Sequence, residues 1–276
     1  MHGRLEERFM KAVMWGAALL TATMVVLIIG NVLVNGLSHI STEFLLANPK
    51  NMGREGGIYS SIISTIYLVL VALALSTPLG VGAAIFLVEY KRRGRLLSLI
   101  RFTTECLAGI PSIIFGVFGF SFFVLFLGMG WSILSGALTL ALMVLPIIVR
   151  TSEEALRAVP NAHREGSLAL GATRAQTIFR VVLPTALPGI LTGVVLSTGR
   201  AIGESAAVIL TAGSALGVPS SLLAPGRALS VHLYVLAVEG ISMERAYATG
   251  AVLIMAVVTI NILMNRLSAR QRLRVR

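Results

Sequence analysis

The sequence predicts an all-α membrane protein with six transmembrane helices, and three observations carry this prediction. First, 56% of the 276 residues are apolar and only 13% are charged, too few polar residues to cover the surface of a soluble protein. Second, several uncharged runs reach the roughly 20 residues that cross a hydrocarbon core. Third, the basic residues gather between alternate runs, as membrane orientation requires.

Five uncharged runs locate the expected helices: residues 12–41, 56–88, 106–149, 181–199 and 246–265. The third run is long enough for two crossings, and Gly128 and Gly130 favour a tight turn between them. The six helices are therefore expected near residues 23, 73, 117, 141, 198 and 256. The first run is longer than a signal-peptide core, so we expect a retained membrane anchor.

The distribution of lysine and arginine predicts the orientation. With an internal N-terminus, eighteen basic residues fall inside, in the segments 4–11, 91–101, 150–180 and 266–276. The opposite side receives only Lys50, Arg54, Arg227 and Arg245. Because positive residues accumulate on the cytoplasmic side, both termini are expected to be cytoplasmic.

Three connections are too long for simple turns. The two external ones, about 36–57 and 213–245, are each expected to contain a short helix at the outer mouth. The largest cytoplasmic segment, 150–186, is predicted to form two short helices. The first would end at Gly171, and the second would start at Thr173 with Gln176 in capping-box spacing. Such a helical pair would present a rigid knob to another protein, the alternative being an ordinary loop.

The residue patterns of several enzyme classes are missing from the sequence. No lysine follows the glycine of a Walker A loop, and there is no Gly-x-Ser-x-Gly elbow or His-Glu-x-x-His helix. The four histidines are scattered, and the single cysteine, Cys106, excludes an internal disulfide and is expected to be packed. The net charge is +11, but the basic residues lie between apolar runs and are not arranged as they would be on a nucleic-acid-binding surface. We expect no catalytic residue and no metal site.

Arg200 and Glu204 are the unusual charges, because they lie in an apolar segment from Val181 to Pro219. A charge at the bilayer centre costs about 2.5–3.5 kcal/mol on insertion scales, so both need compensation. At the i, i+4 spacing they could compensate each other and merely hold helices together. The alternative, which we favour, is that they line a translocation path, since a guanidinium suits an anion.

Three other groups of residues are expected to have a structural role. A stripe of small and weakly polar residues follows one face of the second helix: Ser61, Ser64, Thr65, Leu68, Ala72 and Ser76. We expect it to allow close helix packing; the alternative is that it forms a pore wall. Gly116 and Gly119 are also expected at close contacts. Glu153 and Glu154 are expected to form a solvated ion-pair network with neighbouring arginines.

The segment 150–186 resembles the EAA loop of ABC importer permeases. The matching residues are Glu165-Gly166-Ser167, Gly171 six residues after the glutamate, and Val181-Val182-Leu183-Pro184. The family pattern has Glu-Ala-Ala and Ile-x-Leu-Pro, so Gly166, Ser167 and Val181 depart from it while keeping small or branched apolar character. In this family the loop docks on a cytoplasmic ATPase. The resemblance thus assigns ATPase coupling to Glu165, Gly166, Ser167, Gly171, Leu183 and Pro184.

Further segments resemble the PstA-type phosphate permeases. They are Gly56-Gly57-Ile58, Pro78-Leu79-Gly80-Val81-Gly82 through Glu89-Tyr90, Gly109 to Gly116, and Gly199 to Ala206. The PstC-type partner subunit shares much of this pattern and remains an alternative. So does a permease for another oxyanion.

The resemblance implies a type I ABC importer permease fold, one permease domain over 1–276 with its core at about 58–266, and a bacterial inner-membrane location. It also implies a second, PstC-like permease, a PstB-like ATPase dimer and a PstS-like phosphate-binding protein as partners. ATP and magnesium would be bound by the ATPase, so this chain is expected to bind no cofactor and to be no enzyme. A secondary transporter would show inverted halves, and an intramembrane enzyme would need a nucleophile and base. Neither signature is present.

Overall fold

The computed structural model describes residues 2–90 and 94–274, and within these ranges the chain forms helices and no β-strand. The first half contains α1 (His2–Leu37), α2 (Thr42–Leu46), the turn η1 (Asn51–Gly53), α3 (Tyr59–Ile85), η2 (Phe86–Tyr90), α4 (Arg95–Gly109), α5 (Ser112–Gly119) and η3 (Phe120–Phe126). The second half contains α6 (Ile133–Arg157), α7 (Asn161–Ala169), α8 (Arg174–Thr177), η4 (Ile178–Val182), α9 (Leu183–Gly203), α10 (Ala206–Thr211), α11 (Leu229–Val238) and α12 (Met243–Arg274). The segments η2, η3 and η4 are π-helical.

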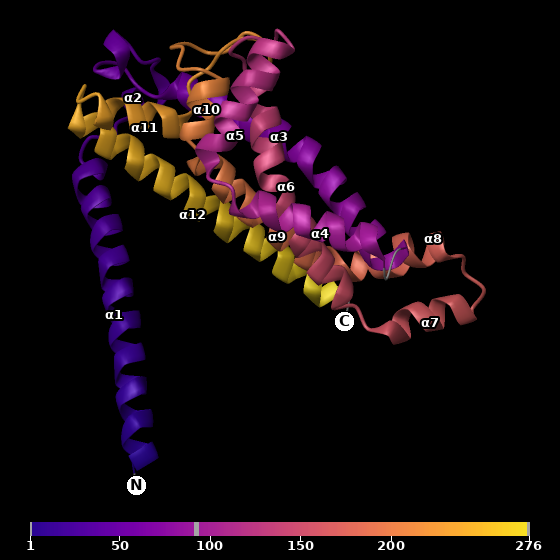
Figure 1. Ribbon diagram of the computed structural model, residues 1–276. Helices are drawn as coiled ribbons and strands as arrows, with labels where there is room; N and C mark the ends of the chain where they lie inside the picture. Colours follow the sequence, from indigo (N-terminus) through magenta and orange to yellow (C-terminus); the bar gives the residue numbers. More distant parts are fainter. Residues whose placement is uncertain (1, 91–93, 275–276) are drawn as a thin grey trace.

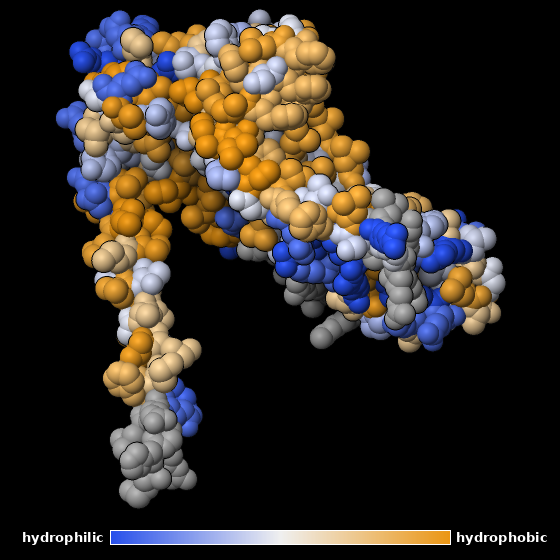
Figure 2. Space-filling model, in the orientation of Figure 1, coloured by the Kyte–Doolittle hydropathy of each residue, from blue (hydrophilic) through white to orange (hydrophobic). Residues whose placement is uncertain are grey.

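The long helices other than α1 run between two ends of the molecule, whereas α1 diverges from them (Figure 1). One end carries α7 and α8 and is called the α7 end; the other carries α2, α10 and α11 and is called the α2 end. Figure 2 shows a broad apolar surface between hydrophilic residues at the two ends. This distribution fits a molecule that crosses a hydrocarbon core with both ends in water.

Among the described residues, five helices are long and apolar enough to cross a membrane, and a bent pair can supply a sixth. The pair is Ser98–Gly109 with Ser112–Phe126, bent by 101°. The prediction of six crossings is therefore supported, but the third is not the single straight helix expected near residue 117. Pro111 breaks it, because proline lacks an N–H and holds Ile110 in extended conformation. The turn predicted at Gly128 and Gly130 is confirmed, with φ of +67° and +64°.

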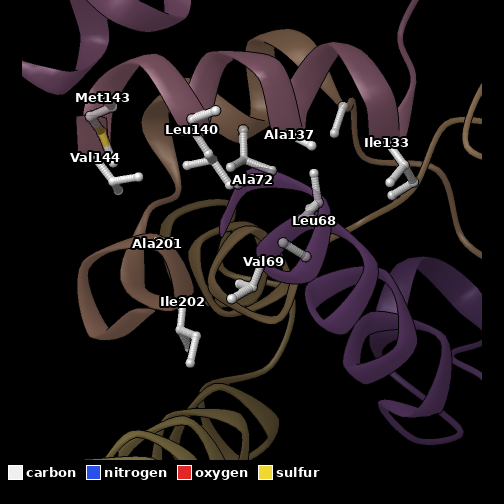
Figure 3. Close-up of a cluster of buried hydrophobic side chains, with 14 of the residues drawn as sticks. Leu68, Val69, Ala72, Ile133, Ala137, Leu140, Met143, Val144, Ala201 and Ile202 are labelled. Carbon is white, nitrogen blue, oxygen red and sulfur yellow. The ribbon is translucent and has the colours of Figure 1, made fainter. Parts of the chain in front are cut away.

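The core is formed mainly by α3, α6 and α9. In Figure 3, Leu140 and Ala137 of α6 lie over Leu68 and Ala72 of α3, while Ile202 of α9 belongs to the same cluster. Lipid tails are as apolar as these side chains, so the helices associate through close packing more than through burial from water. Small residues permit this close packing. Core packing thus fixes how α3, α6 and α9 sit against one another.

Five of the six residues in the small-residue stripe of α3 are buried, as the packing interpretation predicts: Ser61, Ser64, Leu68, Ala72 and Ser76 are each at most 2% exposed. The sixth, Thr65, is half-buried, and its Oγ1 accepts a hydrogen bond from Leu229 N at 2.8 Å. Gly116 and Gly119 are confirmed as close contacts. A Cβ at Gly116 would lie 2.8 Å from Ala207 Cα, and one at Gly119 would overlap Thr139. These positions serve contact between helices.

The short helices expected in the external connections are present as α2 and α11. Two other expectations are wrong. The fifth predicted helix, centred near 198, already begins at Arg174 and ends at Gly203, where α10 follows as a separate turn. Cys106 is exposed instead of packed, because α4 turns that side outward.

Candidate coupling and translocation sites

The segment between α6 and α9 forms the two short helices that the sequence predicts. Gly171 adopts φ +82°, the left-handed conformation that ends α7 and that glycine accommodates without strain. The capping box at α8 is complete: Thr173 Oγ1 accepts a hydrogen bond from Gln176 N at 3.3 Å, and Thr173 N donates to Gln176 Oε1 at 2.8 Å. Local sequence therefore determines this helix–turn–helix, which we call the α7–α8 hairpin.

The residues matched to the EAA pattern fall into two groups. Glu165, Gly166 and Gly171 are exposed on the α7 arm. Ser167 is partly buried, and its hydroxyl lies 3.0 Å from Thr177 Oγ1, linking the two arms. Leu183 and Pro184 lie in the first turn of α9, beyond η4.

Leu170 is an exposed apolar residue that the sequence analysis did not single out. It lies at the tip of the α7–α8 hairpin and is 90% exposed, the highest value among the large hydrophobic residues whose exposure the structure describes. An apolar side chain so displayed at a turn is a natural contact for another protein. Its position immediately before the turn glycine could have indicated it.

The α7–α8 hairpin is fastened to α3 by a buried ion pair that the sequence analysis missed. Arg164 of α7 and Glu89 of η2 are only 8% and 5% exposed. Arg164 Nε and Nη2 donate to Glu89 Oε1 at 3.0 and 2.8 Å. Sequence analysis named Glu89 only as part of a family segment, because 75 residues separate it from Arg164.

A second cation reaches the same point from the other arm. Arg174 of α8 donates through Nη2 to the backbone oxygen of Glu89, and its guanidinium lies 5.2 Å from the centre of the Tyr90 ring. Both arms of the α7–α8 hairpin thus contact the end of the α3–η2 helix.

The acidic pair at the end of α6 behaves differently from expectation. Glu154 pairs with Arg150 and is exposed, as predicted. Glu153 is largely buried and accepts from Arg101 Nη2 at 2.7 Å and Arg157 Nη2 at 2.6 Å. Because Arg101 belongs to α4, Glu153 connects two helices instead of joining a solvated network.

Arg200 and Glu204 do not form the helical pair that their spacing suggests. α9 ends at Gly203, and Glu204 adopts an extended conformation with ψ of 120°. Its Oε1 accepts from Ala207 N at 3.2 Å, at the start of α10. Among the described residues no ion pair joins Arg200 to Glu204. Arg200 is exposed on the single chain.

Within residues 2–90 and 94–274, no three histidine, cysteine or glutamate side chains gather as a metal site would require. The site geometry therefore consists of a projecting hairpin fastened to α3 and of two charges at the end of α9.

The sequence is similar to those of known membrane transport proteins. Over 98% of this chain and 96% of the relative, the sequence is 32% identical to the "Probable ABC transporter permease protein YqgI" of Bacillus subtilis. It is 38% identical to the "Phosphate transport system permease protein PstA 1" of Mycobacterium tuberculosis, over 75% of this chain and 69% of that protein.

Solved structures show the same fold at low identity. A bacterial alginate ABC transporter matches 96% of this chain and 94% of its own with a TM-score of 0.67 and 17% identity. The MetNI methionine ABC transporter matches 75% of this chain and 93% of its own with a TM-score of 0.64 and 20% identity. The fold is that of a type I ABC importer permease, a membrane component that is not itself an enzyme, because the ATPase is a separate subunit. Since the family model matches residues 76–276, this chain belongs to the family described as "Binding-protein-dependent transport system inner membrane component".

Proposed function

We propose that this chain is a transmembrane permease subunit of an ATP-driven inorganic phosphate importer. The proposal of phosphate as substrate rests on sequence identity. The chain is 37–38% identical to proteins named as phosphate transport system permeases from Mycobacterium tuberculosis and Xylella fastidiosa. Permeases for another oxyanion, and a PstC-type role in the phosphate importer, are the alternatives.

In this proposal the α7–α8 hairpin docks the ATPase. The exposed Glu165, Gly166, Leu170 and Gly171 form a compact surface on a hairpin whose turn and caps are fixed. Its docking would place the α7 end and both termini in the cytoplasm. The chain then acts as one permease domain, with a PstC-like permease, a PstB-like ATPase dimer that binds ATP and magnesium, and a PstS-like phosphate-binding protein.

Arg200 and Glu204 would lie on the translocation path. Arg200 has no carboxylate partner among the described residues and is exposed on the isolated chain, so its charge needs compensation from outside the chain. Phosphate is an anion whose lost hydration a guanidinium can replace with charge-assisted hydrogen bonds. Glu204 is engaged at the start of α10, which leaves Arg200 available to such an anion.

Reconstitution tests the function directly. The chain, co-expressed with its partner permease and ATPase, is placed in liposomes with the binding protein, and uptake of labelled phosphate is compared with that of sulfate. We expect ATP-dependent phosphate uptake. Sulfate uptake in place of phosphate would support the other-oxyanion alternative, and the absence of an associated ATPase would contradict the importer assignment.

The path assignment is tested by Arg200→Gln, which keeps much of the side-chain volume and removes the charge. Assembly should remain and phosphate uptake should fall severely, while Lys50→Gln, an exposed cation at the α2 end, should transport normally. The double variant Arg200→Gln, Glu204→Gln should stay defective. If the double variant transports like the parent, Arg200 only neutralises Glu204.

Orientation is tested with single cysteines in a Cys106→Ser background, which is needed because Cys106 is exposed. An impermeant thiol reagent added to intact spheroplasts should label Lys50→Cys and spare Ser98→Cys and Leu170→Cys. Labelling of Leu170→Cys from outside would reverse the proposed orientation.

Docking through the α7–α8 hairpin is tested at its turn. Gly171→Val introduces a branched side chain at φ +82°, which disfavours the turn. The variant should remain in the membrane, bind the ATPase poorly and lose uptake. Normal assembly with normal uptake would refute this docking role.

A further inference from the structure

We propose that Glu89 is the point at which movement of the α7–α8 hairpin is transmitted to α3, with Arg164 and Arg174 acting as positioning residues. The inference rests on the proposed docking of an ATPase by the α7–α8 hairpin. It adds which transmembrane helix the hairpin moves and through which side chains.

The first observation is the completeness of the contacts that Arg164 makes. Beyond its two hydrogen bonds to Glu89, Nη1 donates to Val159 O at 2.7 Å and Nη2 to Leu156 O at 2.8 Å. Leu156 belongs to the last turn of α6 and Val159 follows it, so the guanidinium also binds main-chain oxygens at and just beyond the end of that helix. One buried side chain therefore joins the end of α3–η2, the end of α6 and α7.

The second observation is that the other arm meets the same residue. Arg174 donates to the backbone oxygen of Glu89 and stacks over Tyr90. The side chain of Glu89 is thus held by α7 and its main chain by α8. Two contacts from different arms restrict rotation as well as translation, so the α7–α8 hairpin cannot tilt without carrying the end of η2.

The third observation concerns what lies on either side of this point. η2 continues α3 without a break, and α3 has its most extensive packing against α6 in the core. On the other side, α8 runs through η4 into α9, the helix that ends near Arg200. π-Helical segments lie at both joints, and such segments occur frequently at functional sites. The α7–α8 hairpin is therefore connected to the translocation helices by two routes, α3 through Glu89 and α9 through η4.

A buried ion pair is a costly way to obtain stability alone, since well-packed apolar residues of similar volume often serve as well or better. What the arginine adds, with two N–H groups converging on one carboxylate oxygen, is a fixed direction. That property suits a joint that must keep its geometry while the parts around it move.

Distance measurement tests the joint. Nitroxide labels at Ala162→Cys on α7 and Ala74→Cys on α3, both exposed positions, are introduced in the Cys106→Ser background of the full transporter. We expect the same distance, to within about 2 Å, in the nucleotide-free and vanadate-trapped states, since about 2 Å is the scale of a helix shift. In Glu89→Gln and Arg164→Gln the distance should change or broaden on trapping.

Activity measurements distinguish a transmission role from a purely structural one, because loss of a purely structural ion pair would leave stimulation and uptake unchanged. Glu89→Gln and Arg164→Gln should keep the ATPase bound and hydrolysing ATP, but stimulation by the loaded binding protein and phosphate uptake should both fall at least tenfold. Glu154→Gln, which removes an exposed ion pair at the same end, is the matched control and should behave as the parent.

The outcomes separate the inference from the function on which it rests. If the unsubstituted chain binds no ATPase, both fail. If the ATPase binds and drives uptake, but the labels move apart in the parent or the Gln variants keep normal stimulation, only the transmission role of Glu89 is overturned.

Discussion

The two ends of the molecule each bury an arginine, and they hold it in different ways. Arg164 at the α7 end pairs with a carboxylate, Glu89, and two main-chain oxygens. Arg227 at the α2 end is 4% exposed, and its partners among the described residues are main-chain oxygens alone, Ser214 O at 2.9 Å and Met52 O at 3.3 Å. Burial lowers the pKa of Arg227, and the negative charge of Glu239 partly opposes this shift.

The difference shows two uses of one side chain. Arg164 joins helices, so its loss leaves a buried negative charge. Arg227 joins two loops, one of which contains Asn51, Met52 and Gly53 at φ of +46°, +60° and +104°. Such left-handed residues are held by their surroundings and not by their own preference. The α2 end therefore depends on packing around a constrained loop, and the α7 end on charge pairing.

The largest expected effect is the loss of the charge pair. Arg164→Met should reduce the free energy of unfolding by about 3–5 kcal/mol, because Glu89 is left buried and uncompensated. Arg227→Met should cost about 2 kcal/mol, because only hydrogen bonds to carbonyls are lost. Thermal unfolding in detergent measures both. Adding Glu89→Leu to Arg164→Met should recover much of the loss, and failure to recover would contradict the pairing argument.

The next effect is a pH dependence at the α2 end. Burial, with a smaller contribution from the charge of Arg227, lowers the pKa of His232 from 6.5 to about 4. The neutral form is favoured in the folded state, so stability is complete above pH 6.5 and is lost as the pH falls towards 4. The loss should reach about 3 kcal/mol, at 1.36 kcal/mol per pKa unit.

Unfolding temperatures between pH 7 and 4 check this prediction. His232→Gln should flatten the profile, whereas His163→Gln, at an exposed position of α7, is the control at the other end. An unchanged slope in His232→Gln would mean that the histidine does not carry the effect.

The smallest expected effect compares two turn glycines. Gly171→Ala meets open space and should cost only the roughly 1–2 kcal/mol of a left-handed backbone. Gly53→Ala has the same backbone cost, but its Cβ would also lie 2.7 Å from His232 Cε1 and 3.2 Å from Leu236 Cδ2. Gly53→Ala should therefore be the more destabilising of the two, and His232→Ala in the same chain should narrow the difference. Equal losses of stability in Gly53→Ala and Gly171→Ala would show that the His232 side chain moves aside without a loss of stability.

What the sequence could predict is local. Uncharged runs predict the crossings because the length and apolar character of a membrane helix are properties of its own segment, whatever packs beside it. The turn at Gly171 and the capping box at Thr173 were predictable because their hydrogen bonds join residues within five positions. The residues matched to the EAA pattern could be named in the same way, although their docking role stays a prediction.

The tertiary structure decided everything that depends on how distant segments meet. Spacing alone suggested a helical pair of Arg200 and Glu204, but the helix ends at Gly203 and Glu204 binds Ala207 N instead. The pairing of Arg164 with Glu89 has no local signal, since α3 and α7 must first be brought together by the α3–α6 core. A side chain's partner is chosen by packing over the whole molecule, which no window of neighbouring residues contains.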